Sequence, residues 1–159
     1  MSSTVTAPYL TTRQRAREQA FQFLYRYDQE LSVTLTHTEL ENEFAKHVTH
    51  FESTPESEQF ALRLIKTTLD HLQAVDAMIL KHLQNWRPER LGAIEKSFLR
   101  MGTAELLYFK DVPASVTLDE VVELSKRFGE AETPAFLNGI LDPIAKEPDA
   151  LDKKIPSNS

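Results

Sequence analysis

The chain has 159 residues, and its composition excludes several classes of protein before any motif is considered. Its 18 Lys and Arg against 24 Asp and Glu give a formal net charge of −6, so it should not coat nucleic acid through bulk electrostatics. The absence of cysteine removes disulfides, thiolate zinc sites and cysteine nucleophiles. Without a signal-peptide pattern or an apolar run of about 18 residues, we expect a cytoplasmic protein with no membrane contact.

The N-terminal segment predicts an arm followed by a helix. Residues 1–11 show no periodicity and are expected to form a flexible arm that leads into a basic stretch. Over residues 12–30 apolar side chains recur at helical spacing, and two threonines at the start can cap the helix. Phe21 and Tyr25 lie together but off this apolar stripe, so we predict a second, aromatic edge that the core does not need.

Three arginines lie at the start of this helix, where the macrodipole disfavours positive charge. Arg13, Arg15 and Arg17 could form a solvated helix start whose dipole is compensated by Glu18. Alternatively they contact phosphate, because arginine is the preferred forked donor to that group. Neighbouring aromatic residues could then stack on unpaired bases, so the pattern favours RNA or single-strand binding.

Capping signals predict two helices in the middle of the chain. Capping boxes within residues 36–41 begin a short helix that ends near residue 51. A proline at position 55, directly after a threonine, begins the next helix. This helix is predicted to break near residues 73–74 and to end before Pro88.

The second half predicts a buried helix followed by two others. Residues 89–109 carry apolar side chains on a wide face, which indicates a central helix buried on several sides. A capping box at Thr117 is expected to open the next helix, which ends at Gly129 as a C′ glycine. Thr133 and the proline after it should begin the last helix, followed by a polar tail over 147–159.

No segment alternates with a period of two residues, so the sequence predicts an all-α protein of about seven helices. We expect one domain over residues 12–146, made of two small packed helical bundles. The predicted subdomains are residues 12–84 and 85–146.

Few residues are candidates for catalysis or metal binding, and they predict neither an enzyme nor a cofactor or metal site. His47 and His50 lie one helical turn apart but lack a carboxylate at matching spacing, so we expect surface histidines. Glu105 lies on the apolar face of its helix. It could be a catalytic acid with a raised pKa, but a hydrogen-bonded core group is the favoured interpretation.

Several motifs resemble the bacterial NusB family of transcription antitermination proteins. They are R-x-R-A-R-E-x-A-x-x-x-L-Y (13–25), R-L-x-x-I-E-K-x-x-L-R-M-x-x-x-E-L-L-Y (90–108) and F-L-N-G-I-L-D-P-I-A (136–145). The resemblance implies two helical bundles and a non-catalytic role in the antitermination complex of RNA polymerase, notably on ribosomal RNA. It also implies binding to boxA-like single-stranded RNA, jointly with the ribosomal small-subunit protein that acts as Nus factor E.

The resemblance implies the site residues position by position. RNA contacts map to Arg13, Arg15, Arg17, Glu132 and Phe136. Contacts with the ribosomal partner map to Tyr25, Glu89 and Glu95. The sequence departs from the family at Gln14, where arginine is frequent, and at Pro88, where leucine is common.

Two alternatives remain open from the sequence. The first is a protein–protein adaptor that binds through Phe21 and Tyr25 without touching RNA, which a salt titration of RNA binding would separate from the leading interpretation. The second is an RNA-modifying enzyme, because a similar domain occurs fused to a ribosomal RNA cytosine methyltransferase. The chain has no glycine-rich cofactor loop and no cysteine nucleophile, which argues against that enzyme.

Overall fold

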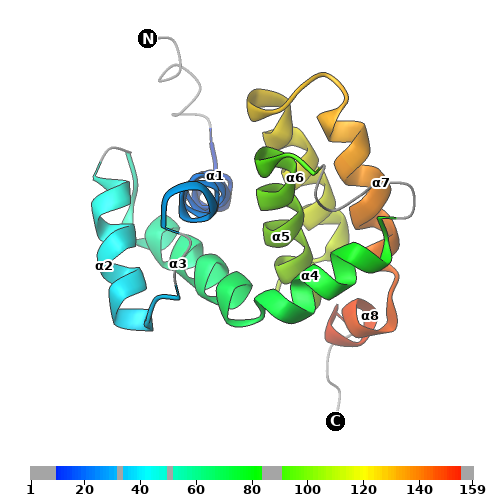
Figure 1. Cartoon of the computed structure of the whole chain (residues 1–159), viewed down its shortest axis with the longest axis horizontal. Coiled ribbons are helices and arrows are strands. Elements are labelled where there is room, and N and C mark those ends of the chain that lie inside the picture. The colour runs from blue at the N-terminus through cyan, green and yellow to red at the C-terminus, as the bar shows by residue number, and fades with distance from the viewer. Residues whose placement is uncertain (1–9, 32–33, 50–51, 84–90, 155–159) are drawn as a thin grey trace. The chain divides into compact units, whose positions relative to one another are not determined.

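The computed structural model describes residues 10–31, 34–49, 52–83 and 91–154. Every regular element within these ranges is a helix, so the predicted all-α fold is confirmed (Figure 1). The chain forms two compact units, unit 1 (Met1–Lys66) and unit 2 (Thr67–Ser159). The division predicted from the sequence lies later, between residues 84 and 85. None of the helices described is both long and apolar enough to cross a membrane.

The described part of unit 1 contains helices whose starts follow from local capping. Its elements are α1 (Thr12–Arg26), the π-helical turn η3 (Tyr27–Leu31), α2 (His37–Val48) and most of α3 (Pro55–Asp70). Thr11 caps α1: its hydroxyl accepts from the Gln14 N–H over 3.1 Å, and the Gln14 side chain accepts from the Thr11 N–H over 2.9 Å. Thr36 and Glu39 form the same capping box before α2, as predicted.

The core of unit 1 forms around Phe23 of α1. Its ring makes edge contacts with Phe44 and His47 of α2, with centroids 6.0 Å and 5.6 Å away. His47 is buried, so the prediction of a surface histidine is wrong there, and His50 lies outside the described residues. Phe21 is also buried, at 3% exposure, and belongs to the core rather than to an exposed aromatic edge. The reason is that α1 is covered on more sides than a single apolar stripe.

The described part of unit 2 is organised around α5. After the end of α3 it contains α4 (Leu72–Lys81), α5 (Ala93–Tyr108), α6 (Ala114–Phe128), α7 (Thr133–Ala145) and α8 (Pro148–Lys154). The α5 helix contacts α4, α6, α7 and α8, which confirms the predicted central helix, although it begins later than residue 89. Phe98, Leu99, Met101 and Leu106 of α5 are fully buried.

Gly102 allows α5 to approach its neighbours closely. A Cβ at this position would lie 3.1 Å from Cδ1 of Leu141 in α7 and 3.5 Å from Cγ2 of Val121 in α6. A side chain would therefore press against the buried Leu141 in a close-packed core, while Val121 would be in ordinary contact. The glycine thus helps to hold α7, which carries two of the predicted RNA contacts, against the rest of unit 2.

The capping role predicted for Thr117 is wrong. The α6 helix begins at Ala114, after the extended residue Pro113, so Thr117 lies inside the helix. Its hydroxyl donates to the Glu105 carboxylate, and both side chains are buried. A buried acid needs a hydrogen-bond donor, and this long-range contact takes the hydroxyl that capping would have used. The contact favours the structural interpretation of Glu105.

Other boundaries also differ from the prediction. The break between α3 and α4 falls at His71 rather than at residues 73–74. Gly129 is the C-cap of α6 with φ of −103°, so it does not adopt the left-handed backbone of a C′ glycine. Residues expected to form a polar tail make α8 instead, because Ala150 is fully buried and α8 packs against α5.

Candidate nucleic-acid and partner interface

The arginines at the start of α1 differ in exposure. Arg13 is exposed, Arg15 is half-buried and Arg17 is only 2% exposed. The first turn of α1 contains no acidic residue, so nothing in that turn offsets positive charge at the positive end of the helix dipole. Arg13 and Arg15 are therefore accessible to a ligand to different degrees, whereas Arg17 is buried.

The ring of Phe60 on α3 gathers arginine side chains from two helices. Cζ of Arg13 lies 4.4 Å from the ring centroid, and Cζ of Arg17 lies 5.4 Å from it. Arg63, one turn further along α3, places its Cζ at 5.9 Å from the same centroid. All three distances fall within the cation–π range of about 6 Å. Sequence reasoning missed Arg63, and the available signal was its spacing of three residues from Phe60 on a predicted helix.

Tyr25 is an exposed aromatic residue on a rigid base. It is 37% exposed, and its ring centroid lies 6.3 Å from that of the buried Phe21, one turn earlier in α1. A large ring with one packed side and one free side suits a protein contact, because little conformational entropy is lost on binding. The structure thus keeps Tyr25 as a candidate partner residue and removes Phe21 from that surface.

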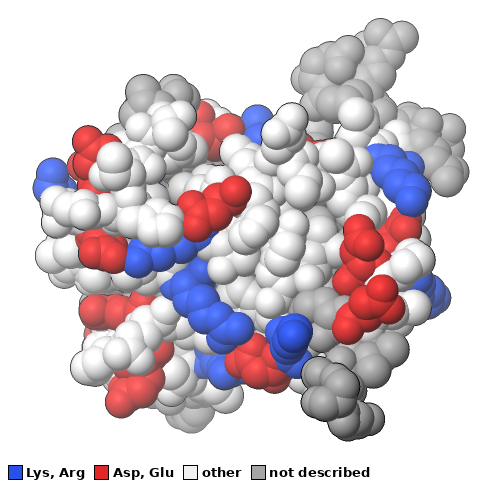
Figure 2. Space-filling view, turned by 90° about the horizontal axis from the view of Figure 1, so that it is seen from below, with Lys and Arg blue, Asp and Glu red and all other residues white. Residues whose placement is uncertain are grey.

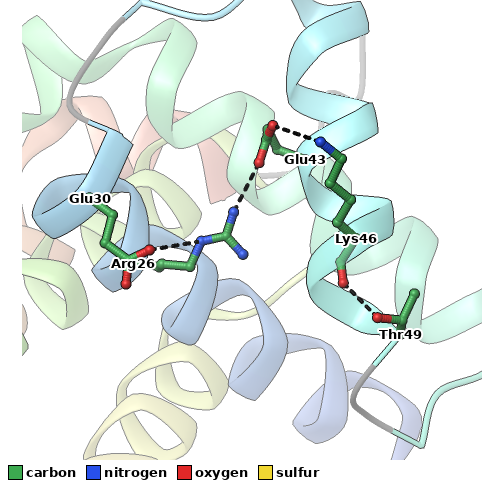
Figure 3. A network of polar contacts seen from close by, with 5 residues as sticks. All are labelled: Arg26, Glu30, Glu43, Lys46 and Thr49. Carbon is green, nitrogen blue, oxygen red and sulfur yellow. Dashed lines mark hydrogen bonds and ion pairs between the residues drawn. The ribbon is translucent and has the colours of Figure 1, made fainter.

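Arg26, the fourth arginine of this region, is engaged with acidic side chains (Figure 3). Its guanidinium lies 3.0 Å from the Glu43 carboxylate of α2 and 3.8 Å from that of Glu30. Glu43 also contacts Lys46 over 3.4 Å. The Arg26–Glu43 ion pair joins α1 to α2 next to Tyr25 and leaves Arg26 poorly suited to bind phosphate.

Charge is not gathered into one broad field on the face of the molecule shown in Figure 2. Basic and acidic side chains are interspersed there. An acidic chain with interspersed charges attracts a polyanion only through a local cluster. The arginines around Phe60 form such a cluster.

Glu95 lies in the first turn of α5 and is tied to the start of α7. Its Oε1 lies over Gly92, where a Cβ would collide with it, and its Oε2 accepts a hydrogen bond from the Thr133 hydroxyl over 2.8 Å. The same hydroxyl accepts from the Glu130 N–H over 2.9 Å. Gly129 packs against Thr133, leaving no space for a side chain. Glu95 therefore shapes the loop before α7 as well as presenting a half-buried carboxylate.

The two RNA contacts predicted in unit 2 lie one turn apart at the start of α7. Glu132 is the exposed N-cap residue, and its carbonyl accepts from the Phe136 N–H over 3.1 Å. Phe136 is half-buried. The structure brings these two residues together and places Glu95 against the same loop through Thr133. Glu89, and residues 1–9 of the predicted arm, lie outside the described residues.

Comparison with known proteins shows which family the chain resembles over most of its length. The NusB family matches residues 14–146. The transcription antitermination protein NusB of a Nitratiruptor species is 40% identical over 139 residues, which cover 87% of this chain and 94% of that protein.

Solved structures extend the similarity to the fold. NusB of T. maritima superimposes with a TM-score of 0.77 at 32% identity, covering 90% of this chain and 96% of that one. A crystal structure of antitermination factors NusB and NusE in complex with double-stranded RNA matches with a TM-score of 0.72 at 29% identity, covering 85% and 96%. With a family match over most of its length and relatives of this similarity, the chain belongs to the NusB family of transcription antitermination proteins.

Proposed function

We propose that this chain is a non-catalytic, RNA-binding transcription antitermination factor. It binds boxA-type single-stranded RNA together with the ribosomal small-subunit protein that acts as Nus factor E, and it supports ribosomal RNA transcription within the antitermination complex of RNA polymerase. The observation that carries the proposal is the accessible pair Arg13 and Arg15, held at a helix start whose first turn has no acid. The relative solved with NusE and RNA supports it.

The two units supply different kinds of RNA contact in this proposal. Arg13 and Arg15 bind phosphate, which sets affinity but reads no sequence. Glu132 accepts a hydrogen bond from a base amino group, a contact that a carboxylate makes well with cytosine. Phe136, one turn away, stacks on an unpaired base.

The ribosomal partner binds through Tyr25 together with Glu95 and Glu89. The negative charge of the two carboxylates complements a basic ribosomal protein and favours its encounter with this chain. Tyr25 supplies the aromatic anchor, supported from below by Phe21.

Equilibrium RNA binding over a series of salt concentrations tests the proposal. Fluorescence anisotropy would use a labelled boxA-like single strand and a scrambled strand of equal length, each with and without the ribosomal protein. We expect preferential boxA binding that tightens with the partner, and a log–log salt slope of about 2 or less in magnitude if two arginines dominate the phosphate contacts. The proposal is wrong if the boxA strand does not bind even with the partner present.

The adaptor alternative keeps one observation in its favour. Arg17 is buried and Arg26 is ion-paired, so the accessible positive charge of α1 is small, whereas Tyr25 is clearly available to a protein. An adaptor would bind the ribosomal protein normally. The anisotropy of the labelled RNA would then not change when the chain is added, at any salt concentration.

A further inference from the structure

The cluster around Phe60 holds more positive charge than the α1 arginines alone. The Cζ atoms of Arg13, Arg17 and Arg63 all lie within 5.9 Å of one ring centroid. No two of these atoms can therefore be more than about 12 Å apart, which is close to the screening length of about 10 Å at 0.1 M salt. Cation–π contacts with one ring attract each guanidinium, but the three cations still repel one another.

Neutral or basic residues occupy the positions three and four residues away from these arginines along their own helices. In α3, the residues three and four positions from Arg63 are Gln59, Phe60, Lys66 and Thr67. Arg13 and Arg17 are four residues apart in α1, so each has a like charge at the spacing where an acid would form an ion pair. A cluster of guanidinium groups offers forked hydrogen-bond donors, which suit an anion such as phosphate.

The residues of the cluster differ in exposure, two being buried and two exposed. Arg17 and Phe60 are 2% and 7% exposed, whereas Arg13 and Arg63 are exposed. The two accessible guanidiniums therefore come from different helices, and both lie near the buried ring of Phe60.

We propose that the phosphate-binding surface of unit 1 extends from α1 onto α3, with Arg63 as a direct phosphate ligand. Arg17 is a positioning residue: together with Phe60 it supports Arg13 and Arg63 and does not itself contact RNA. This inference rests on the proposed RNA-binding function. It assigns the backbone of a single-stranded RNA, rather than a particular base, to Arg63.

The first test compares Arg63→Ala with Lys46→Ala, which removes one positive charge from the exposed face of α2 in the same unit. With the boxA-like strand and the partner present, Arg63→Ala should weaken binding roughly two- to tenfold. Its log–log salt slope should fall by about 0.7 in magnitude, the value of one phosphate contact on a single strand. Arg63→Lys should recover part of the affinity, because it keeps the charge without the guanidinium fork. Lys46→Ala should bind like the wild type.

The second test separates positioning from contact by a double-mutant cycle between Arg17→Met and Arg63→Ala. If Arg17 acts through Arg63, the effect of Arg17→Met should be smaller in the Arg63→Ala background. Arg17→Met should also leave more of the salt slope intact than Arg63→Ala does. Thermal unfolding of each variant shows whether the protein tolerates the buried substitution Arg17→Met. Whether Arg63 binds phosphate is decided by Arg63→Ala on an exposed helix face, even if Arg17→Met does not fold.

The outcomes distinguish failure of this inference from failure of the proposed RNA-binding function on which it rests. If the wild type binds boxA RNA and Arg13→Ala weakens binding, but Arg63→Ala matches Lys46→Ala, the extension onto α3 is wrong and RNA binding stands. If the wild type does not bind the RNA with the partner present, both fail together.

Discussion

The Thr133 hydroxyl donates to Oε2 of Glu95 over 2.8 Å and thereby joins the first turn of α5 to the first turn of α7. The hydroxyl also accepts from the Glu130 N–H, so one side chain satisfies two polar groups of the loop that leads to Glu132. Thr133 is buried, which shields both contacts from competing water. The loop expected to meet RNA is thus held by a residue predicted to meet the protein partner.

Replacing Thr133 by valine should destabilise the protein while preserving its shape. The substitution leaves the Glu95 carboxylate and the Glu130 N–H without this partner, which we expect to cost about 1–3 kcal/mol. Thr133→Ser keeps the hydroxyl and should lose well under half of that. Urea unfolding of both variants measures the difference. Equal losses for valine and serine would mean that the methyl packing, and not the hydroxyl, matters here.

Glu95→Gln should separate the charge of this residue from its hydrogen bond. The amide oxygen can still accept from Thr133, so stability and RNA binding without the partner should stay near the wild type. Affinity for the ribosomal protein should fall, because the carboxylate charge is lost. Calorimetry with the ribosomal protein measures that affinity. Unchanged partner affinity would assign Glu95 a purely structural role.

Helical periodicity was enough to predict the fold class because burial of an apolar stripe dominates where helices form. It predicted α5 as the central helix, and the capping box at Thr36 was found from local sequence alone. Thr117 shows where such reasoning stops. A threonine before a helical pattern can cap the helix or donate a hydrogen bond to a distant acceptor. Thr117 donates to Glu105, a buried acid twelve residues away, and this contact is not visible in the local sequence.

The sequence predicts which residues belong to the candidate site but not how accessible each of them is. The arginine series at residues 13–17 marks the site, yet only the packing of α1 with α3 decides that Arg17 is buried. Arg63 was missed because a lone arginine on a helix face looks like any solvated charge. The same limit applies to Phe21, whose burial depends on contacts outside its own helix.

Stability should fall in acid partly through Glu147. Lys81 at the end of α4 donates to its carboxylate over 3.1 Å, and His82 lies 2.6 Å from it. These hydrogen bonds, that of Lys81 first, lower the pKa of Glu147 from its ordinary value of 4.5. A lowered pKa in the folded state adds stability above pH 4.5, which is lost as the pH falls through the lowered value.

Glu147→Gln should therefore lower the thermal midpoint of unfolding at neutral pH. The midpoint of this variant should also decrease less than that of the wild type as the pH is lowered. Melting curves from neutral pH into acid would show this, since the stabilising charge of the Glu147 carboxylate is lost as it protonates. Asp119→Asn, which removes an exposed acid of α6, is the matched control and should leave the acid limb unchanged. Parallel curves for Glu147→Gln and the wild type would contradict the role of this contact.

Phe136→Ala should affect RNA binding more than folding. The ring is half-buried, so its removal should destabilise the protein by less than the 3 kcal/mol or more, in order of magnitude, that a core phenylalanine costs. Loss of a stacked base should lower RNA affinity by about 1–3 kcal/mol. Leu137→Ala, at a fully buried neighbour, should show the reverse pattern. A stability loss at Phe136 equal to that at Leu137 would identify it as an ordinary core residue.

Gln14→Arg should exchange helix stability for RNA affinity. Gln14 closes the capping box with Thr11, and arginine cannot accept the Thr11 N–H. The α1 start should lose about 0.5–1 kcal/mol, as for a weakened cap, with a further small penalty for another cation at the positive end of the dipole. In return, a new phosphate contact should steepen the salt slope of RNA binding by about 0.7.

Gln14→Ala is the matched control for this exchange, because it removes the cap without adding charge. It should lose similar stability and leave the salt slope unchanged. Anisotropy titrations at several salt concentrations, paired with urea unfolding, measure both quantities on the same variants. The arginines of α1 would then be explained as charges kept for phosphate at a helix start that Thr11 and Gln14 stabilise in their place. If Gln14→Arg leaves RNA binding unchanged, the first turn of α1 does not face the phosphate backbone.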